Sequence, residues 1–184
     1  MAAAAETFAQ GDMRPLKVFF QDEARFGRMS NPARCWAPAG VRPIVPMQRI
    51  REYTYVYGAV CPVDGESFSL ILPCANTEMM TLYLREFSHY YKDYRVVMLM
   101  DGAMWHKAKG LETFENIRTV IQPSYSPELN PAEHLWEHIR ENYLRNGFWP
   151  SMKELEKALM NALIAIVCNK ETIQTLVGFH WAIF

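Results

Sequence analysis

Residues 96–102 read Val-Val-Met-Leu-Met-Asp-Gly, and they decide the class of fold. A continuous apolar run without alternation is typical of a strand that is buried on both faces of its sheet. Such a strand needs helices on both sides of the sheet, which is the arrangement of α/β domains. The run ends at Asp101-Gly102, so a carboxylate comes directly after the buried strand.

Further strands and helices are predicted on either side of this run. Runs rich in β-branched, aromatic and apolar residues predict strands at residues 17–22, 53–60, 68–72 and 119–122. Gly27 and the prolines that follow it predict a break after the first strand. The stretch up to Pro46 is predicted to be a loop or an edge strand. Helical spacing of apolar residues predicts three helices, which begin at Asn76 or Thr77, at Asn130-Pro131, and at Ser151.

The order of these elements is strands first, then helix, strand, strand, helix and helix. It predicts an α/β domain with a mixed sheet flanked by helices. We expect residues 1–13, which are alanine-rich and polar, to form a disordered leader, and residues 14–184 to form the domain.

Composition excludes several classes of protein. Half of the 184 residues are hydrophobic and 21% are charged, which excludes a disordered chain. The sequence has neither an apolar run long enough to span a bilayer nor the basic start of a secretion signal. The four cysteines are scattered, which is typical of reduced thiols. We therefore expect a cytoplasmic protein without a membrane partner.

Charge is unevenly distributed along the chain. Residues 14–51 hold eight basic and two acidic side chains, a net charge of +6, whereas the whole chain has a net charge of −1. A basic segment in a nearly neutral chain favours a patch that faces a polyanion. A solvated, arginine-rich loop is the alternative interpretation.

Three carboxylates occupy the ends of predicted elements. Asp22 closes the first strand, Asp101 closes the buried strand, and Glu133 lies in the first turn of the helix that begins at Asn130. Ends of neighbouring strands meet in one crevice of an α/β sheet. Carboxylates gathered there are ligands for Mg²⁺ or Mn²⁺, and two such ions support phosphoryl transfer.

Each of these acids also has an ordinary structural interpretation. Asp101 before a glycine suits a turn, Asp22 can pair with Arg25 or Arg28, and Glu133 holds the position of the glutamate in a capping box. A second constellation competes with the first: His134-x-x-Glu137-His138 matches a zinc-protease helix motif. That alternative leaves Asp22 and Asp101 unexplained.

Three blocks of the sequence resemble a known family. They are Gln-Asp-Glu-Ala-Arg-Phe-Gly at 21–27, Met-Asp-Gly-Ala-Met-Trp-His-Lys at 100–107, and Tyr-Ser-Pro-Glu-Leu-Asn-Pro-Ala-Glu-His-Leu-Trp at 125–136. In this order they resemble blocks of DDE-superfamily transposases, most closely the mariner-like group of bacterial insertion sequences. The third block is the most specific because it is long and unusual.

The resemblance implies an RNase H-like fold in which Asp22, Asp101 and Glu133 are catalytic and hold two Mg²⁺ (or Mn²⁺) ions. It implies cleavage of DNA strands at the terminal repeats of an element and joining of the freed 3′-hydroxyl to target DNA. A homodimer in the bacterial cytoplasm, at the nucleoid, is a further implication.

Other residues near the blocks are assigned lesser roles. We expect Arg25, Arg28, Lys107 and Lys109 to bind DNA by neutralising phosphates, since they lie near the acids in sequence. Asn130 and His106 are expected to support the site. The family normally has helix-turn-helix domains before the catalytic domain, and here we expect that part to be absent. An inactive DNA-binding or dimerisation module derived from a transposase is therefore an alternative.

Overall fold

A single mixed sheet forms the centre of the computed structural model, which describes residues 2–30, 32–106, 110–123 and 126–183. Its strands are β1 (Leu16–Met29), β2 (Arg49–Cys61), β3 (Glu66–Leu72), β4 (Arg95–Met100) and β5 (Ile117–Ile121), in the spatial order β3-β2-β1-β4-β5. β1, β2 and β3 are antiparallel, whereas β4 and β5 run parallel to β1. β1 is therefore the central strand, with an antiparallel partner on one side and a parallel partner on the other.

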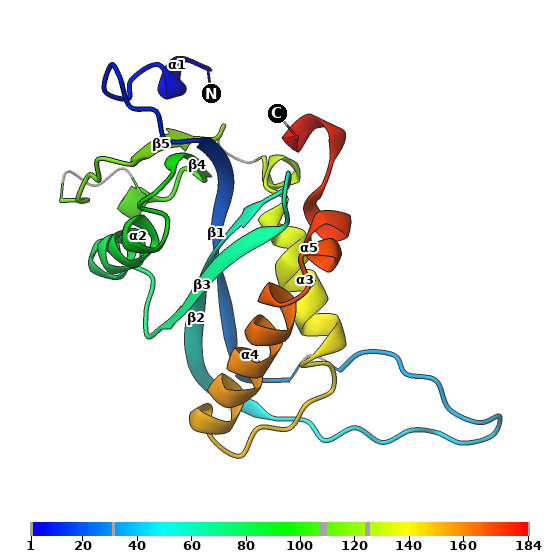
Figure 1. Cartoon of the computed structure of the whole chain (residues 1–184). Helices are drawn as coiled ribbons and strands as arrows, with labels where there is room; N and C mark the ends of the chain where they lie inside the picture. The colour runs from blue at the N-terminus through cyan, green and yellow to red at the C-terminus, as the bar shows by residue number, and fades with distance from the viewer. Residues whose placement is uncertain (1, 31, 107–109, 124–125, 184) are drawn as a thin grey trace.

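Helices cover both faces of this sheet (Figure 1). α2 (Thr77–Tyr90) lies on one face, and α3 (Ala132–Asn142), α4 (Met152–Val167) and α5 (Lys170–Val177) lie on the other. Short helical segments are α1 (Ala2–Ala5), η1 (Met104–His106), η2 (Pro127–Leu129) and η3 (His180–Ala182). The predicted class, an α/β domain with a mixed sheet flanked by helices, is confirmed.

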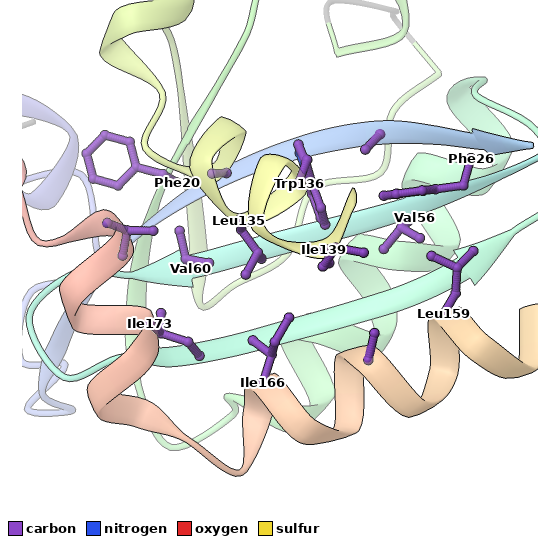
Figure 2. Packing of buried hydrophobic residues seen from close by; sticks show 14 of the residues in the cluster. Phe20, Phe26, Val56, Val60, Leu135, Trp136, Ile139, Leu159, Ile166 and Ile173 are labelled. Atoms are coloured by element: carbon purple, nitrogen blue, oxygen red, sulfur yellow. The ribbon is translucent and has the colours of Figure 1, made fainter. Parts of the chain in front are cut away.

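Alternating side chains of β1 supply two apolar cores. Phe19 packs with α2, where its ring lies 5.0 Å from that of Phe87. Phe20 and Phe26 point to the opposite face and pack with α3, α4 and α5. Figure 2 shows Leu135, Trp136 and Ile139 of α3 directed at the strands of this second core. The two cores fix α2 and α3 relative to β1, because a strand presents successive side chains to opposite faces.

The predicted helix starts are largely confirmed. Asn76 accepts a hydrogen bond from the backbone N–H of Met79 at 2.8 Å, and Ser151 accepts one from Glu154 at 3.3 Å. α3 begins at Ala132, one residue later than the predicted first helical position at Pro131. The sequence prediction missed α5, whose eight residues are too few to show a clear helical period.

The prediction that the first strand ends at Asp22 is wrong. β1 continues to Met29 because β2 remains paired with it as far as residue 29. Gly27 does not break the strand; a Cβ atom there would overlap the ring of Tyr53 and the carbonyl of Glu52. The glycine therefore permits a close approach of β2, which the sequence alone does not distinguish from a turn.

Residues 30 and 32–48, between β1 and β2, form an extended arm that projects from the domain (Figure 1). The arm has the loop character predicted from its prolines, and its described residues include the exposed Arg34, Trp36 and Arg42. No helix in the described ranges has the length and apolarity that a bilayer crossing requires.

Residues 2–13 lie in the segment that the sequence predicts to be a disordered leader. They contain α1, and the buried ring of Phe8 lies 4.5 Å from the guanidinium of Arg118. This part of the segment therefore packs against the domain, and the boundary at residue 14 stays a prediction.

Replacement of Phe87 by alanine tests the α2 core independently of the candidate site. Phe87 is fully buried among aromatic rings, so Phe87→Ala should lower the free energy of unfolding by about 3–5 kcal/mol. Urea denaturation measures this change. The matched control is Glu86→Ala on the exposed side of the same turn, for which a change below about 0.5 kcal/mol is expected. Equal effects of the two variants would contradict the assigned orientation of α2.

Candidate active site

Asp22 and Asp101 lie at the same level on neighbouring strands. β1 and β4 pair in parallel, with Phe20 opposite Leu99. Asp22 and Asp101 each come two residues after that pair. β4 ends at Met100, so β1 loses its parallel neighbour where Asp22 stands. Asp22 and Asp101 therefore stand at the same end of two neighbouring parallel strands, although Asp22 lies inside a strand that continues along β2.

The start of α3 brings Glu133 close to Asp22. Asn130 is buried, and its side-chain amide donates to the carbonyl oxygen of Gln21 at 3.0 Å. The side-chain oxygen of Asn130 accepts from the backbone N–H of Ala132 at 3.2 Å. Asn130 thus ties the first turn of α3 to the residue before Asp22, and its support role stays a prediction. Glu133 itself is exposed.

Asp22 is an unusual carboxylate. Its side chain lies in the interior with 8% of the residue exposed, and its Oδ2 accepts a hydrogen bond from the indole Nε1 of Trp136 at 2.7 Å. Burial, together with the negative charge of Glu133, raises the pKa of Asp22 to about 7. Asp22 and Glu133 are therefore electrostatically coupled, and a cation between them would relieve the repulsion.

Asp101 belongs to a second group of polar residues. Its Oδ1 accepts from the backbone N–H of Ala103 at 2.9 Å and lies 2.8 Å from Nδ1 of His106. The other ring nitrogen of His106 lies 2.9 Å from Oε1 of Glu23. Burial opposes protonation of His106, but the carboxylates of Asp101 and Glu23 outweigh it and raise the pKa of His106 to about 10. His106 is therefore a buried cation that links the end of β4 to β1.

The predicted acids are thus only partly brought together. In the part of the chain that the structure describes, the group of acidic and histidine side chains whose ligand atoms all lie within 4.8 Å of one another is Glu23, Asp101 and His106. Asp22 and Glu133 are coupled by charge, and Asp101 is placed on the adjoining strand end.

Sequence reasoning missed three residues of the site. Glu23 was passed over because it follows Asp22 and therefore points to the opposite face of β1. Trp136 was assigned to packing, and its spacing of three from Glu133 was the available signal that both face the site. Gly58, opposite Asp22 on β2, gives no signal in a single sequence.

The predicted DNA-binding cations differ in their surroundings. Arg25 is exposed, and its guanidinium lies 4.5 Å from the ring centre of Tyr53. Arg28 is only 12% exposed in its side chain and donates to the carbonyls of Trp149 and Pro150 and to Glu52. Arg28 therefore anchors the segment before α4, and its role as a DNA contact stays a prediction. Lys107 and Lys109 lie outside the described residues.

A cleft of about 660 Å³ adjoins Glu133. Its walls come from the end of β1, the base of the arm and α3, and they include Arg25, Arg140 and Arg145. Glu137 and Glu141 line the same cleft beside Glu133. The arginines of this mixed lining suit a polyanion next to a metal site.

The zinc-protease alternative receives no support from the geometry. His134 and His138 lie on α3, where the ring of His134 packs 5.1 Å from that of Phe179 and His138 lies 3.1 Å from the side-chain amide of Asn142. Within the described ranges, neither histidine belongs to a group of three possible metal ligands.

The raised pKa of Asp22 predicts a specific dependence of stability on pH. The folded protein keeps the Asp22 proton up to a pH of about 7, whereas the unfolded chain loses it near the ordinary value of 3.8. The stability associated with this proton is present below that lower value and is lost as the pH rises to about 7.

Asp22→Asn should remove this dependence. From pH 5 to pH 8 the free energy of unfolding should fall by on the order of 2 kcal/mol more in the wild type than in Asp22→Asn. Urea denaturation at the two pH values measures the difference, and the contribution of His106 is common to both proteins. Identical pH dependence of the two proteins would show that Asp22 ionises normally.

Comparison with known proteins shows the family. The model of the DDE superfamily endonuclease family matches residues 17–156. An uncharacterized protein of Sinorhizobium fredii, y4pE/y4sA, is 39% identical over 131 residues, which are 71% of this chain and 97% of that protein. The transposable element Tc3 transposase of Caenorhabditis elegans is 25% identical over 169 residues, which are 84% of this chain and 50% of the transposase.

A solved structure agrees in fold. The crystal structure of the Mos1 mariner paired end complex with Mn superposes with a TM-score of 0.62 at 17% identity and covers 87% of this chain and 53% of the Mos1 chain. The RNase H-like fold implied by the resemblance is confirmed. The chain spans about half the length of the Tc3 and Mos1 proteins. Because the family model matches well over half of its residues, the chain belongs to the DDE superfamily of endonucleases.

Proposed function

We propose that this chain is the catalytic domain of a DNA transposase that uses Asp22, Asp101 and Glu133 to cleave DNA strands and to join a 3′-hydroxyl to target DNA. The observation that supports it best is the convergence of the three sequence blocks. β1 and β4 present Asp22 and Asp101 at one level, and Asn130 ties the helix of Glu133 to the same point of β1. A module without catalytic activity would have no chemical reason to bring these three acids together.

The donor set fits hard divalent cations. The three side chains offer carboxylate oxygens, which Mg²⁺ and Mn²⁺ prefer. The repulsion that raises the pKa of Asp22 is the kind that a bound cation removes. When bound by these residues, two such ions would activate the attacking oxygen and stabilise the leaving oxygen of a phosphodiester.

The chain's own residues would bind and orient the DNA. Arg25 is exposed beside the cleft next to Glu133, and Arg140 and Arg145 line the same cleft. Their charges would neutralise phosphates close to the carboxylates. The arm adds the exposed Arg34 and Arg42.

The relatives support a proposal for the DNA substrate and the assembly. The Mos1 neighbour is a paired end complex, and the Tc3 relative is a transposase of a transposable element. We propose that the present chain acts on element ends and target DNA, as a homodimer, in the bacterial cytoplasm.

Substitution of single carboxylates tests the proposed chemistry. Asp101→Asn and Glu133→Gln should each abolish Mn²⁺-dependent nicking of supercoiled DNA, because each removes a charged ligand while keeping its shape. The matched control is Glu128→Gln, an exposed glutamate of η2 in the same block, which should nick at the wild-type rate. Nicking by Asp101→Asn at the wild-type rate would refute the assignment of the triad.

Arg25 and Arg28 give opposite predictions for DNA binding. Arg25→Ala should weaken binding and reduce the salt dependence of log Kd by about one unit of slope, because one phosphate contact is lost. Arg28→Ala should instead lower the free energy of unfolding by about 1–3 kcal/mol, because its bonds to Trp149, Pro150 and Glu52 are lost. Fluorescence anisotropy at several salt concentrations and urea denaturation separate the two effects. A smaller salt slope for Arg28→Ala than for Arg25→Ala would reverse the assignment.

A further inference from the structure

Trp136 makes a contact that packing alone does not require. The residue is 1% exposed, and its indole N–H donates to Oδ2 of Asp22 at 2.7 Å. A phenylalanine or a leucine would fill an apolar core as well, but neither offers a donor. The one polar atom of the indole therefore donates its hydrogen bond to Asp22, which is one of the three proposed catalytic acids.

Gly58 leaves the space that the indole ring of Trp136 occupies. In the ladder between β1 and β2, Gly58 is the residue opposite Asp22. A Cβ atom built on Gly58 would overlap Cη2 of Trp136 and crowd its Cζ2 at 3.0 Å. The ring therefore lies against bare backbone, directly across the strand pair from the carboxylate to which it donates. Phe26, on the same face of β1, makes an edge contact with the indole at 6.4 Å between ring centres.

α3 presents Trp136 and Glu133 together. The two residues are three apart and are neighbours on the helix surface. One turn of α3 therefore carries both Glu133, an acid of the proposed triad, and Trp136, which donates a hydrogen bond to Asp22, a second acid of the triad. The bond from Asn130 to Gln21 fixes the start of the same helix against β1.

We propose that Trp136, seated on Gly58, is a positioning residue that fixes the orientation of the Asp22 carboxylate for metal binding. The inference rests on the proposed function. Trp136 acts through Asp22 and does not touch DNA or the reacting atoms. It occupies one acceptor site of Oδ2 and leaves the remaining acceptor sites of the carboxylate in a single orientation. Partners of this kind, behind a metal ligand, typically change metal affinity 10–100-fold.

Direct measurement of Mn²⁺ affinity tests the proposal. The free ion is counted by electron paramagnetic resonance during titration of the full chain without DNA. Trp136→Phe, which removes the donor and keeps an aromatic ring, should bind Mn²⁺ about tenfold more weakly than the wild type. Gly58→Ala should weaken binding in the same direction, because its methyl group displaces the indole while every triad residue is retained.

The control is the same substitution at Trp181. Its ring packs against Phe20, two residues before Asp22 on the same face of β1, with ring centres 6.0 Å apart. Trp181→Phe should keep the wild-type affinity for Mn²⁺. Wild-type affinity in both Trp136→Phe and Gly58→Ala would overturn the positioning role, as would an equal loss in Trp181→Phe.

A second measurement applies if the Trp136 variants do not fold. The chain has five tryptophans, so its ¹⁵N spectrum contains five indole signals. One of them should move on addition of Mg²⁺, and the same signal should differ between the wild type and Asp22→Asn. An indole spectrum that responds to neither change would refute the contact.

Asp22→Asn separates this inference from the proposed function. Wild-type Mn²⁺ affinity in Asp22→Asn would show that the proposed metal site itself is wrong. Loss of Mn²⁺ binding in Asp22→Asn, with wild-type binding in Trp136→Phe and Gly58→Ala, would refute only the role of Trp136.

Discussion

The attachment of α3 to β1 is the constraint on which the site depends. Asp22 is a buried carboxylate beside a second carboxylate, an arrangement that costs free energy unless other contacts offset it. The offset comes from the apolar face of α3, where Leu135, Trp136 and Ile139 are almost fully buried against the sheet, α4 and α5 (Figure 2). α3 therefore carries Glu133, which repels Asp22, and also supplies the apolar packing that holds the helix against the sheet.

Much of this arrangement can be predicted from the sequence. The apolar run before Asp101 and the helix starts at Asn76 and Ser151 are local signals, and the structure agrees with them. The continuation of β1 past Gly27 was missed because it depends on pairing with β2, which is a long-range contact. α5 was missed because it is short and is stabilised by Ile173 and Val177 in the second core.

The sequence predicts the three acids of the candidate site and support roles for Asn130 and His106, but not the contacts that these residues make. The block at residues 125–136 points to Glu133, and the predicted strand ends point to Asp22 and Asp101. The seat of Trp136 on Gly58, the bridge of His106 to Glu23 and the use of Arg28 as an anchor all depend on cross-strand registers and on loop placement. A single sequence does not contain those registers, because a glycine, a histidine and an arginine each have many structural uses.

Location of Mn²⁺ by anomalous scattering in crystals of the chain tests the central claim most directly. We expect manganese between the carboxylates of Asp22 and Asp101, with Glu133 close enough to coordinate it. Manganese bound instead at Glu23 and His106, or carboxylates that stay apart with no manganese between them, would contradict the assignment of Asp22, Asp101 and Glu133 as the catalytic metal site.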